Sequence, residues 1–466
     1  MNRRFALGVL LLYVAVVAIV AAHHEPWRDE ADSWLLTRDG SFGEIAQRAH
    51  YGGFPIPWYA LVTPLAKSGL PYASQTMLNA LFAIAAATLV LFFAPFSRTT
   101  KLLVLFSYYL GFEYSAIARP YALSIALLFA AAAFHPRRNE RPIAYALLLA
   151  LAMNVNAQAF VLASVLAAVF VLERREWKTF AIVLAGVVAM FFQVRPLPGG
   201  QRIATLHAFH VTPTALATAF LPTLPQTLGV IAGIVVIGAV AWALRSNAAA
   251  LLVLLGSIGG LLLVFVFLWL GGPRHAGFLL IGVLLAIWIA GGLENRVAHV
   301  LLNLTLAVSC LVAMRTWQQE ITMRFSGSRE MALFIREHGI DREPIAAHNL
   351  TQCEALLPYL DGTKFWYAGL REWGTYLPWD HTMERALDTP YPVAVELARA
   401  YFREKPWHLL LNVEMPDPAR NGFRLVYATH EPVFGVRDER YWLYEPTGLY
   451  EPTGLYEPTG LYEPRR

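Results

Sequence analysis

The sequence predicts an α-helical polytopic membrane protein with about eleven transmembrane helices and a small C-terminal extracytoplasmic α/β domain. Hydrophobic residues make up 57% of the 466 residues and charged residues only 15%, whereas soluble domains carry about a quarter charged residues. Apolar runs dominate as far as Met314, and charged residues become frequent from Arg315 onward. We therefore predict a membrane domain (1–314), an extracytoplasmic α/β domain (315–444) and a repetitive tail (445–466).

The membrane domain is defined by its apolar runs, because a helix needs roughly 17–25 mostly apolar residues to cross a bilayer. Eleven segments meet or approach this length: 5–22, 72–94, 102–113, 120–134, 142–155, 158–172, 179–194, 226–244, 249–270, 278–293 and 298–314. One continuous helix over 102–134 would place Glu113 and Arg119 in mid-membrane, at about 2.5–3.5 kcal/mol for the arginine. We predict two short helices that meet at a polar turn.

The basic residues predict the orientation, because short cytoplasmic loops of membrane proteins are rich in Lys and Arg. With a cytoplasmic N-terminus, these loops hold Arg3, Arg4, Arg98, Lys101, Arg137, Arg138, Arg141, Arg174, Arg175, Lys178, Arg245 and Arg296. An odd number of spans then places the C-terminal domain outside. The first apolar run also resembles a cleavable signal peptide, but it exceeds the usual length of such a run and favours an uncleaved anchor.

The charge and cysteine content exclude other classes of protein. The net charge is +4, but the basic residues cluster at the ends of apolar runs, so no nucleic-acid partner is expected. Cys310 and Cys353 fall in different domains, which makes a disulfide between them and a cysteine-based metal site unexpected.

The C-terminal domain alternates helical and extended patterns. We predict helices at 328–338 and 393–404, and strands at 344–348, 364–367, 408–413, 423–429 and 439–444. The tail repeats Tyr-Glu-Pro-Thr-Gly-Leu from 444 to 461. Its regularly spaced Pro and Gly residues predict a tail without helix or sheet.

The first outer loop carries two adjacent carboxylates, Asp29 and Glu30, flanked by Trp27 and Trp34. One interpretation is an aromatic belt at the membrane surface with solvated charges. The other is a site in which one carboxylate acts as a general base and the second orients a substrate. Partial burial beneath the aromatic rings would raise the pKa of the base towards a useful range. The residues alone leave both interpretations open.

The loop continues with Gly and Pro residues between His50 and Tyr59, which exclude a regular helix there. Irregular backbone at membrane depth is tolerated where it lines a cavity or packs on protein. His50, Trp58 and Tyr59 are therefore candidates for a substrate pocket, although a simple interfacial turn explains this segment better when it is taken alone. The other candidates for the pocket are Trp27, Trp34, Glu113 and Tyr121.

Two further outer segments carry arginines. Arg119 lies in the predicted polar turn between Glu113 and Tyr121, and Arg274-His275 follows a Gly-Gly-Pro sequence. Each arginine could extend towards lipid headgroups, or it could clamp a phosphate through bidentate hydrogen bonds. The acidic pair and both arginine segments fall on the same predicted side. This arrangement suits a reaction on a lipid-linked substrate.

The order of these features resembles that of the C-type, multi-spanning glycosyltransferases, in particular bacterial relatives of the protein O-mannosyltransferases and the lipid A aminoarabinose transferases. The resemblance runs through the membrane part from Asp29-Glu30 through 55–59 and the Ala-Arg-Pro-Tyr turn at 118–121 to Arg274-His275. The Asp-Glu pair is moderately specific, the turn strengthens the resemblance considerably, and the Arg-His loop is weaker.

The resemblance implies a polyprenyl-phosphate sugar donor and an acceptor at the outer face of a bacterial inner membrane. By resemblance, Asp29 would deprotonate the acceptor hydroxyl, and Glu30 would help to position a substrate. Arg119, Arg274 and His275 would hold the donor phosphate, and direct attack would invert the anomeric carbon. The acceptor implied is a glycan, a lipid or a protein.

The sequence departs from the family pattern where relatives often have a His before a Pro pair, because Phe54 stands at that place. If that histidine binds substrate in relatives, this chain lacks it or uses His50 instead. We predict no cofactor and no metal ligands. Some relatives need a divalent metal, but the ligand set here is too thin to predict one.

Two other classes of function fit the sequence less well. A transporter or flippase of lipid-linked sugars would show internal symmetry or matched broken helices, and no clear repeat relates the two halves. A non-catalytic membrane scaffold would leave the acidic pair and the outer arginines unexplained.

Overall fold

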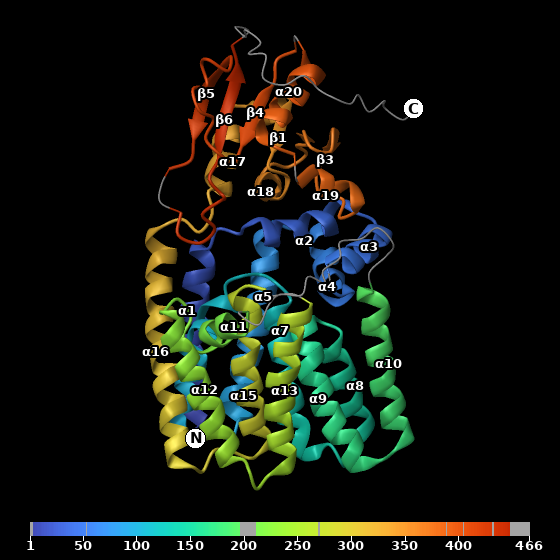
Figure 1. The fold of residues 1–466 in the computed structure, drawn as a ribbon, viewed down its shortest axis with the longest axis vertical. Helices are drawn as coiled ribbons and strands as arrows, with labels where there is room; N and C mark the ends of the chain where they lie inside the picture. Colours follow the sequence, from blue (N-terminus) through green and yellow to red (C-terminus); the bar gives the residue numbers. More distant parts are fainter. Residues whose placement is uncertain are drawn as a thin grey trace.

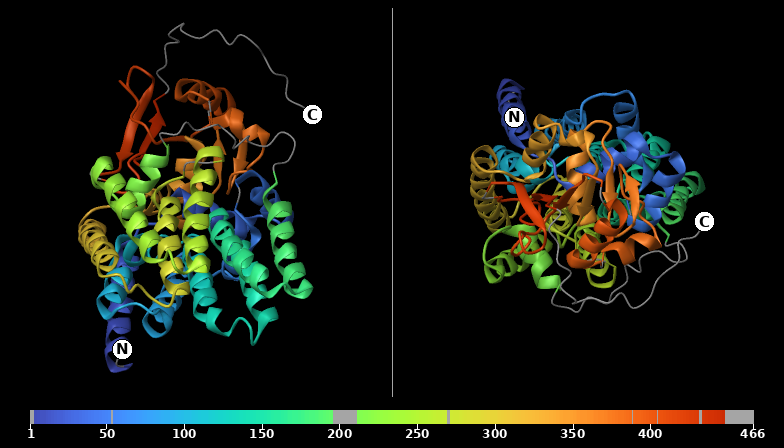
Figure 2. Two further views of the ribbon diagram at one scale, coloured as in Figure 1. Left: turned by 60° about the horizontal axis from the view of Figure 1, so that its bottom comes forward. Right: turned by 90° about the horizontal axis from the view of Figure 1, so that it is seen from above.

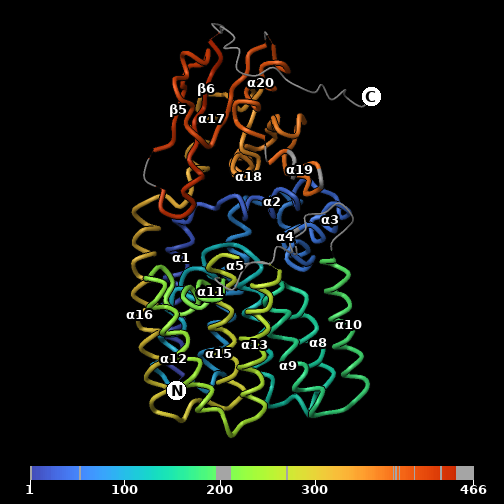
Figure 3. The backbone as a smooth tube through the Cα atoms, in the orientation of Figure 1, coloured from blue at the N-terminus to red at the C-terminus, as the bar shows by residue number. Residues whose placement is uncertain are grey.

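The computed structural model describes residues 3–52, 54–195, 211–268, 271–387, 389–403, 405–430 and 433–447. It shows a bundle of helices with a mixed α/β domain stacked on one end (Figure 1). The N-terminus lies near the opposite end of the bundle, as the backbone trace also shows (Figure 3).

Within the described residues, seven helices are long and apolar enough to cross a membrane. They are α1 (Arg3–His23), α5 (Ala73–Phe93), α9 (Ala157–Arg174), α10 (Trp177–Val194), α12 (Gln226–Ala243), α13 (Ala248–Phe267) and α16 (Arg296–Thr322). Shorter apolar helices complete the bundle: α7 (Tyr121–Phe134), α8 (Pro142–Met153), α11 (Val211–Phe220) and α15 (Phe278–Ile289). These findings confirm the predicted fold class. The last predicted span, 298–314, was too short, because α16 continues to Thr322. This helix therefore crosses the predicted domain boundary at residue 314.

The stretch 102–134 is broken, as predicted. It contains α6 (Arg98–Phe106), a π-helix, η1 (Tyr109–Glu113), and an irregular segment that leads into α7. A π-helix is wound more widely than an α-helix and frequently occurs at functional sites. The predicted span at 102–113 is therefore wrong as a regular helix. The turn that carries Arg119 instead lies inside the protein, with Arg119 only 4% exposed.

Three helices lie between the bundle and the α/β domain: α2 (Arg28–Asp39), α3 (Phe42–Gly52) and α4 (Ile56–Lys67) (Figure 1). No continuous helix runs from His50 to Tyr59, as predicted, but the interruption is short and lies only between Gly52 and Ile56. Gly52 ends α3 and Pro55 precedes the first residue of α4. Proline is tolerated in the first turn of a helix because the N–H that it lacks has no helical partner there.

The α/β domain contains a six-stranded sheet in the order β3-β2-β1-β4-β6-β5. Its strands are β1 (Ile345–His348), β2 (Phe365–Tyr367), β3 (Glu372–Gly374), β4 (His408–Leu411), β5 (Phe423–Ala428) and β6 (Trp442–Pro446). Strand β1 runs parallel to β2 and β4, and the remaining pairs are antiparallel. The longer helices of this domain are α17 (Ser328–Glu337), α19 (His381–Leu387) and α20 (Tyr391–Phe402).

Both predicted helices and all five predicted strands of this domain are present, whereas β3 and α19 were not predicted. The predicted start of the tail at 445 was early, because β6 includes Pro446, at its last position. A proline is compatible with the end of a strand but not with its centre. The prediction for the tail beyond residue 447 lies outside the described residues.

The α/β domain is joined to the bundle by a shared hydrophobic core. Trp34 of α2 and Trp58 of α4 belong to one buried cluster with Met331, Leu356 and Phe365 of the domain. This cluster includes the short 3₁₀-helix η4 (Glu354–Tyr359), which contacts α2. Helix α2 is therefore packed against the domain, and its residues Glu30 and Ser33 also form hydrogen bonds with Gln75 of α5 in the bundle. Figure 2 shows the bundle and the domain from two further directions.

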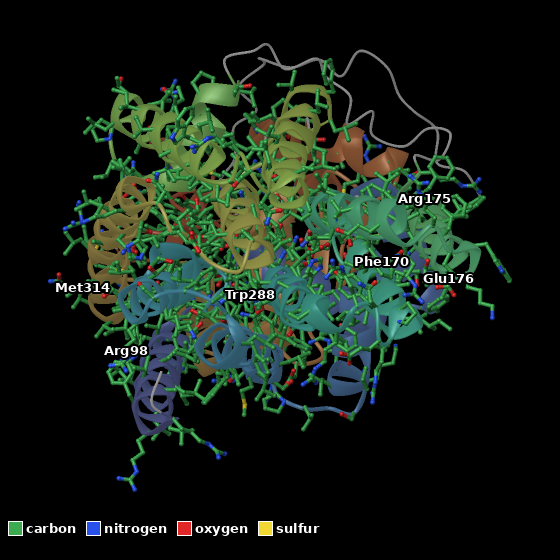
Figure 4. All side chains as sticks on the ribbon, turned by 90° about the horizontal axis from the view of Figure 1, so that it is seen from below. Arg98, Phe170, Arg175, Glu176, Trp288 and Met314 are labelled. Atoms are coloured by element: carbon green, nitrogen blue, oxygen red, sulfur yellow. The ribbon has the colours of Figure 1, made fainter. Side chains whose placement is uncertain are left out.

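The far end of the bundle carries basic residues. Arg98 and Arg175, two of the predicted cytoplasmic residues, lie on the face seen from below, opposite the α/β domain (Figure 4). This separation agrees with the predicted orientation, which itself stays a prediction.

Candidate functional site

The candidate site is built on the first turn of α2. Pro26 and Trp27 lead into the helix, and Asp29 and Glu30 fall in its first turn, where acidic side chains are favoured by the helix dipole. The Glu30 carboxylate reaches back to accept a hydrogen bond from the backbone N–H of Trp27 at 3.3 Å. This contact satisfies one of the free donors at the helix start.

Asp29 meets two arginines from distant parts of the chain. Its carboxylate accepts a hydrogen bond from Arg274 Nη2 at 2.5 Å, and its backbone carbonyl accepts one from Arg119. The Asp29 side chain retains 27% exposure. Burial acts to raise the pKa of Asp29, but the positive charges of Arg274 and Arg119 outweigh it and lower this pKa below its usual value. Asp29 is therefore ionised at neutral pH.

Both arginines are held flat against aromatic rings. The Arg274 guanidinium lies 4.8 Å from the ring centre of Trp27, and that of Arg119 lies 4.6 Å from the ring centre of Phe54. Such stacking fixes the plane of a guanidinium while leaving its N–H groups to other partners. Within the described residues, the Nε–H of each arginine is buried without a hydrogen-bond partner. These donors could bind an anion.

His275 and Tyr121 complete this side of the site. The Nδ1 atom of His275 accepts a hydrogen bond from the backbone N–H of Gly272 at 2.8 Å, so the ring hydrogen resides on Nε2. Nε2 donates to the Tyr121 hydroxyl at 2.7 Å, and this hydroxyl also interacts with Arg274. Gly271 has a φ of +66°, and a Cβ there would lie 2.6 Å from the His275 ring. The glycine permits both the turn and the close packing.

Glu30 differs from its neighbour because it is completely buried. One carboxylate oxygen accepts a hydrogen bond from the backbone N–H of Ala118 at 2.7 Å, and the other contacts His24 Nε2 at 2.9 Å. The other ring nitrogen of His24 lies 2.5 Å from Glu320 of α16. Glu30 therefore connects α2 to the residue before Arg119 and to the end of the bundle.

His24 lies between two carboxylates, and this arrangement predicts a pH-dependent stability. Burial acts to lower the pKa of His24, but Glu30 and Glu320 together outweigh it and raise this pKa to about 10. Because the pKa is higher in the folded protein than its usual value of about 6.5, the resulting stability is complete below pH 6.5. We expect this stability to be lost as the pH rises towards 10.

This expectation can be checked by thermal unfolding of the purified full-length protein in detergent. Between pH 6.5 and 10, the wild-type midpoint should fall further than that of a His24→Gln/Glu320→Gln variant. The variant removes the imidazole and one of its carboxylates but keeps the other groups that titrate in this range. Equal falls in the two proteins would contradict the assignment.

The predicted pocket residues separate into two groups. Trp27 and Tyr121 lie at the site, and Glu113 is buried where it accepts a hydrogen bond from Tyr108 at 2.7 Å. Three others have other surroundings: Trp34 packs on Tyr72, His50 contacts the carbonyl of Arg195, and Trp58 lies in the core shared with the α/β domain. Tyr59 packs with Leu36 and Ile45, but it also interacts electrostatically with Arg119 and Asp29, at the edge of the site.

Several residues near the site were not predicted. Asp32 is bound to Arg48 at 3.0 Å and accepts a hydrogen bond from Trp379 Nε1 at 2.7 Å. It follows Asp29 by three positions and so shares a face of α2. A helical reading of the first outer loop would have revealed this face. Phe54, noted only as a departure from the family pattern, is the ring beneath Arg119.

The α/β domain also contacts the start of α2. Arg28 forms an ion pair with Asp438 at 2.7 Å, and its backbone N–H donates to Glu439 at 3.1 Å. The other Glu439 oxygen accepts a hydrogen bond from Ser326 at 2.6 Å. Burial raises the pKa of Glu439 to about 8. The loop before β6 thus holds the residue that precedes Asp29.

In the part of the chain that the structure describes, no three His, Cys, Asp or Glu side chains are grouped closely enough to hold a metal ion. The carboxylates nearest the site already have cationic or backbone partners.

The whole fold has counterparts among solved structures. A crystal structure of ArnT from Cupriavidus metallidurans in the apo state matches with a TM-score of 0.53 and 14% sequence identity, over 96% of this chain and 100% of that chain. A second structure of the same protein, bound to undecaprenyl phosphate, matches with a TM-score of 0.55 and 13% identity, over 96% and 98% of the two chains.

The chain has the fold of ArnT. The likeness confirms the fold that the resemblance in the sequence implied. The ArnT likeness spans both the bundle and the α/β domain, because the match covers nearly all of each chain. At this level of identity the likeness concerns the fold alone. No family model and no curated protein matches the sequence.

Proposed function

We propose that the protein is a membrane glycosyltransferase that transfers a sugar from a polyprenyl-phosphate donor to an acceptor hydroxyl. The observation that carries this proposal is the meeting of Asp29 with Arg119 and Arg274 at the end of the bundle. A carboxylate beside two arginines with unused N–H groups provides a base and a phosphate site together. The undecaprenyl phosphate bound to ArnT, which has the same fold, supports a ligand of this class.

The two arginines would hold the donor phosphate. The rings of Phe54 and Trp27 support the two guanidinium groups, and the Nε–H of each, which has no partner in the free protein, becomes a donor to a phosphate oxygen when neighbouring side chains move aside for the donor. The Tyr121 hydroxyl accepts from His275, which leaves its own hydrogen for the same anion. These groups neutralise the charge that develops on the phosphate as the bond to the sugar breaks.

Asp29 would act as the base. In the free protein its carboxylate is paired with Arg274, and a bound phosphate would compete for that arginine. Binding of the donor then frees the carboxylate and reduces the positive field around it, so the pKa of Asp29 rises in the complex. The acceptor oxygen attacks the anomeric carbon from the face opposite the phosphate. Its proton passes to Asp29, and the electron pair of the broken C–O bond leaves with the phosphate.

Glu30 would have a different role from the one that the family resemblance implies. Both of its oxygens are bound by the protein, and it is fully buried. We assign it as a positioning residue, which holds the backbone at Ala118 and therefore the origin of the Arg119 side chain.

We further propose that the protein lies in a bacterial inner membrane with its N-terminus in the cytoplasm and the α/β domain outside. The basic residues at the far end of the bundle support this orientation. The site would then face the outer surface, where a lipid-linked donor and an acceptor can both reach it.

The test is transfer by the purified full-length protein in liposomes that contain a panel of polyprenyl-phosphate sugars. Mass spectrometry should detect free polyprenyl phosphate together with a glycosylated product when envelope extract supplies the acceptor. In parallel, envelope glycans of cells with and without the gene should differ by one sugar. Absence of both signals, with donor binding also absent, would overturn the proposal.

A further inference from the structure

A groove of about 1130 Å³ opens on another side of α2, where the bundle meets the α/β domain. Its walls come from the ends of α1 and α5 nearest the α/β domain, from α2, and from α17 and η4. Trp34 and Arg38 of α2 line it. They follow Asp29 by five and nine positions, which places them about 140° and 180° around the helix from it. The groove is therefore separate from the site at Asp29.

The part of the groove within the bundle is apolar and open to the bilayer. Ala18 and Ala22 of α1 face Ala80 of α5 across it, and these small side chains leave room between two helices of spanning length. Met77 and Leu81 at its edge are 69% and 62% exposed. Acyl chains would cover such a surface, because apolar side chains at membrane depth pack against lipid tails.

The part of the groove beneath the α/β domain is basic. Arg329 and Arg336 lie seven positions apart on α17, two helical turns along one face, and both are exposed. Among the described residues, no carboxylate forms an ion pair with either of them. Arg38 also lines the groove, but it is paired with Asp39 at 2.9 Å and lies 3.9 Å from Asp361. The two arginines of α17 therefore remain for an anion.

Two tyrosines lie between the apolar and the basic parts. The rings of Tyr72 and Tyr359 are 5.5 Å apart, and both line the groove. Tyr72 is only 8% exposed, yet its hydroxyl has no partner within the described residues, and neither has that of Tyr359. These hydroxyls have almost no exposed surface, so the two tyrosines contribute their rings, and not their hydroxyls, to the wall of the groove.

We propose that the groove binds an anionic phospholipid of the surrounding membrane. The phosphate contacts Arg329 and Arg336, the rings of Tyr72 and Tyr359 lie between the headgroup and the chains, and the acyl chains lie along α1 and α5. The lipid would bridge the two parts of the protein, because its headgroup contacts the α/β domain and its acyl chains contact the bundle. This assignment does not depend on the proposed transferase function.

Native mass spectrometry of the full-length protein in detergent tests the proposal, with phosphatidylglycerol and phosphatidylcholine of identical chains as probes. The wild type should bind phosphatidylglycerol in preference to phosphatidylcholine. Arg329→Gln/Arg336→Gln should reduce phosphatidylglycerol binding by about tenfold or more and reduce phosphatidylcholine binding much less, because the choline cation already balances the phosphate of that lipid. A matched control, Lys405→Gln/Arg420→Gln, removes two exposed charges of the same domain away from the groove and should have no effect.

A second variant, Ala22→Trp, tests the apolar part because it fills the groove without changing any charge. It should reduce binding of both lipids. The proposal is overturned if the wild type does not distinguish the two lipids, or if the double arginine variant retains the preference. Bound lipid is measured here rather than transferred sugar, so failure of this proposal is distinguishable from failure of the proposed function.

Discussion

An Asp29→Asn variant is expected to lose sugar transfer by about 10²–10⁴-fold in kcat while binding its donor at least as tightly as the wild type. The amide cannot take the proton of the acceptor hydroxyl, so the chemical step loses its base. The same change removes the negative charge that pairs with Arg274 in the free protein. A donor phosphate then has no competitor for that arginine.

This combination distinguishes a base from a structural carboxylate. Turnover would be measured in liposomes at saturating donor, and donor affinity would be measured by binding of polyprenyl phosphate. Asp39→Asn provides the matched control, because Asp39 lies at the other end of α2 and contacts Arg38 instead. Full turnover by Asp29→Asn, or weaker donor binding with unchanged turnover, would refute the assigned role.

An Arg274→Gln variant is expected to reduce transfer by about 10²–10³-fold and to raise the KM for the donor while the KM for the acceptor stays constant. The arginine would donate to the phosphate more strongly as negative charge develops on it, so its loss affects both binding and the barrier. Arg28→Gln serves as the control. Its guanidinium also lies over Trp27, at 5.4 Å, but it is paired with Asp438 of the α/β domain.

The pH dependence gives Arg274→Gln a second readout. Of the positive charges that hold down the pKa of Asp29, Arg274 has the largest influence. Its removal should raise that pKa, so the acidic limb of the kcat/KM profile should move to higher pH. Arg28→Gln should shift the limb less. A variant with lower activity but an unshifted limb would indicate that Arg274 and Asp29 do not interact during turnover.

The sequence predicted the parts of the protein that depend on apolar length and on local polarity. Most of the spans follow from hydropathy, and the prediction that Asp29, Arg119 and Arg274 gather on one side agrees with their contacts. The predicted interruption at the Gly and Pro residues of the first outer loop is present, but the sequence did not reveal that helices reach it from both sides. Gly and Pro both occur at the ends of regular helices.

The different roles of Asp29 and Glu30 could not be predicted from the sequence. Adjacent residues on a helix point about 100° apart, so two neighbouring carboxylates can have unrelated surroundings. The environment of Glu30 depends on His24 and on Glu320, which lies 296 positions beyond that histidine. Hydropathy also does not predict that Trp34 lines the groove between the bundle and the α/β domain and not the site at Asp29.

The core shared by α2 and the α/β domain has a consequence for biosynthesis. Ala31 and Trp34 emerge early from the ribosome, but Leu443, which closes the same buried cluster, is among the last described residues. At about 5–20 residues per second, the start of α2 waits for some tens of seconds before its packing is complete. Chains that terminate before α17 would leave Ala31 and Trp34 without the α/β-domain side of their core.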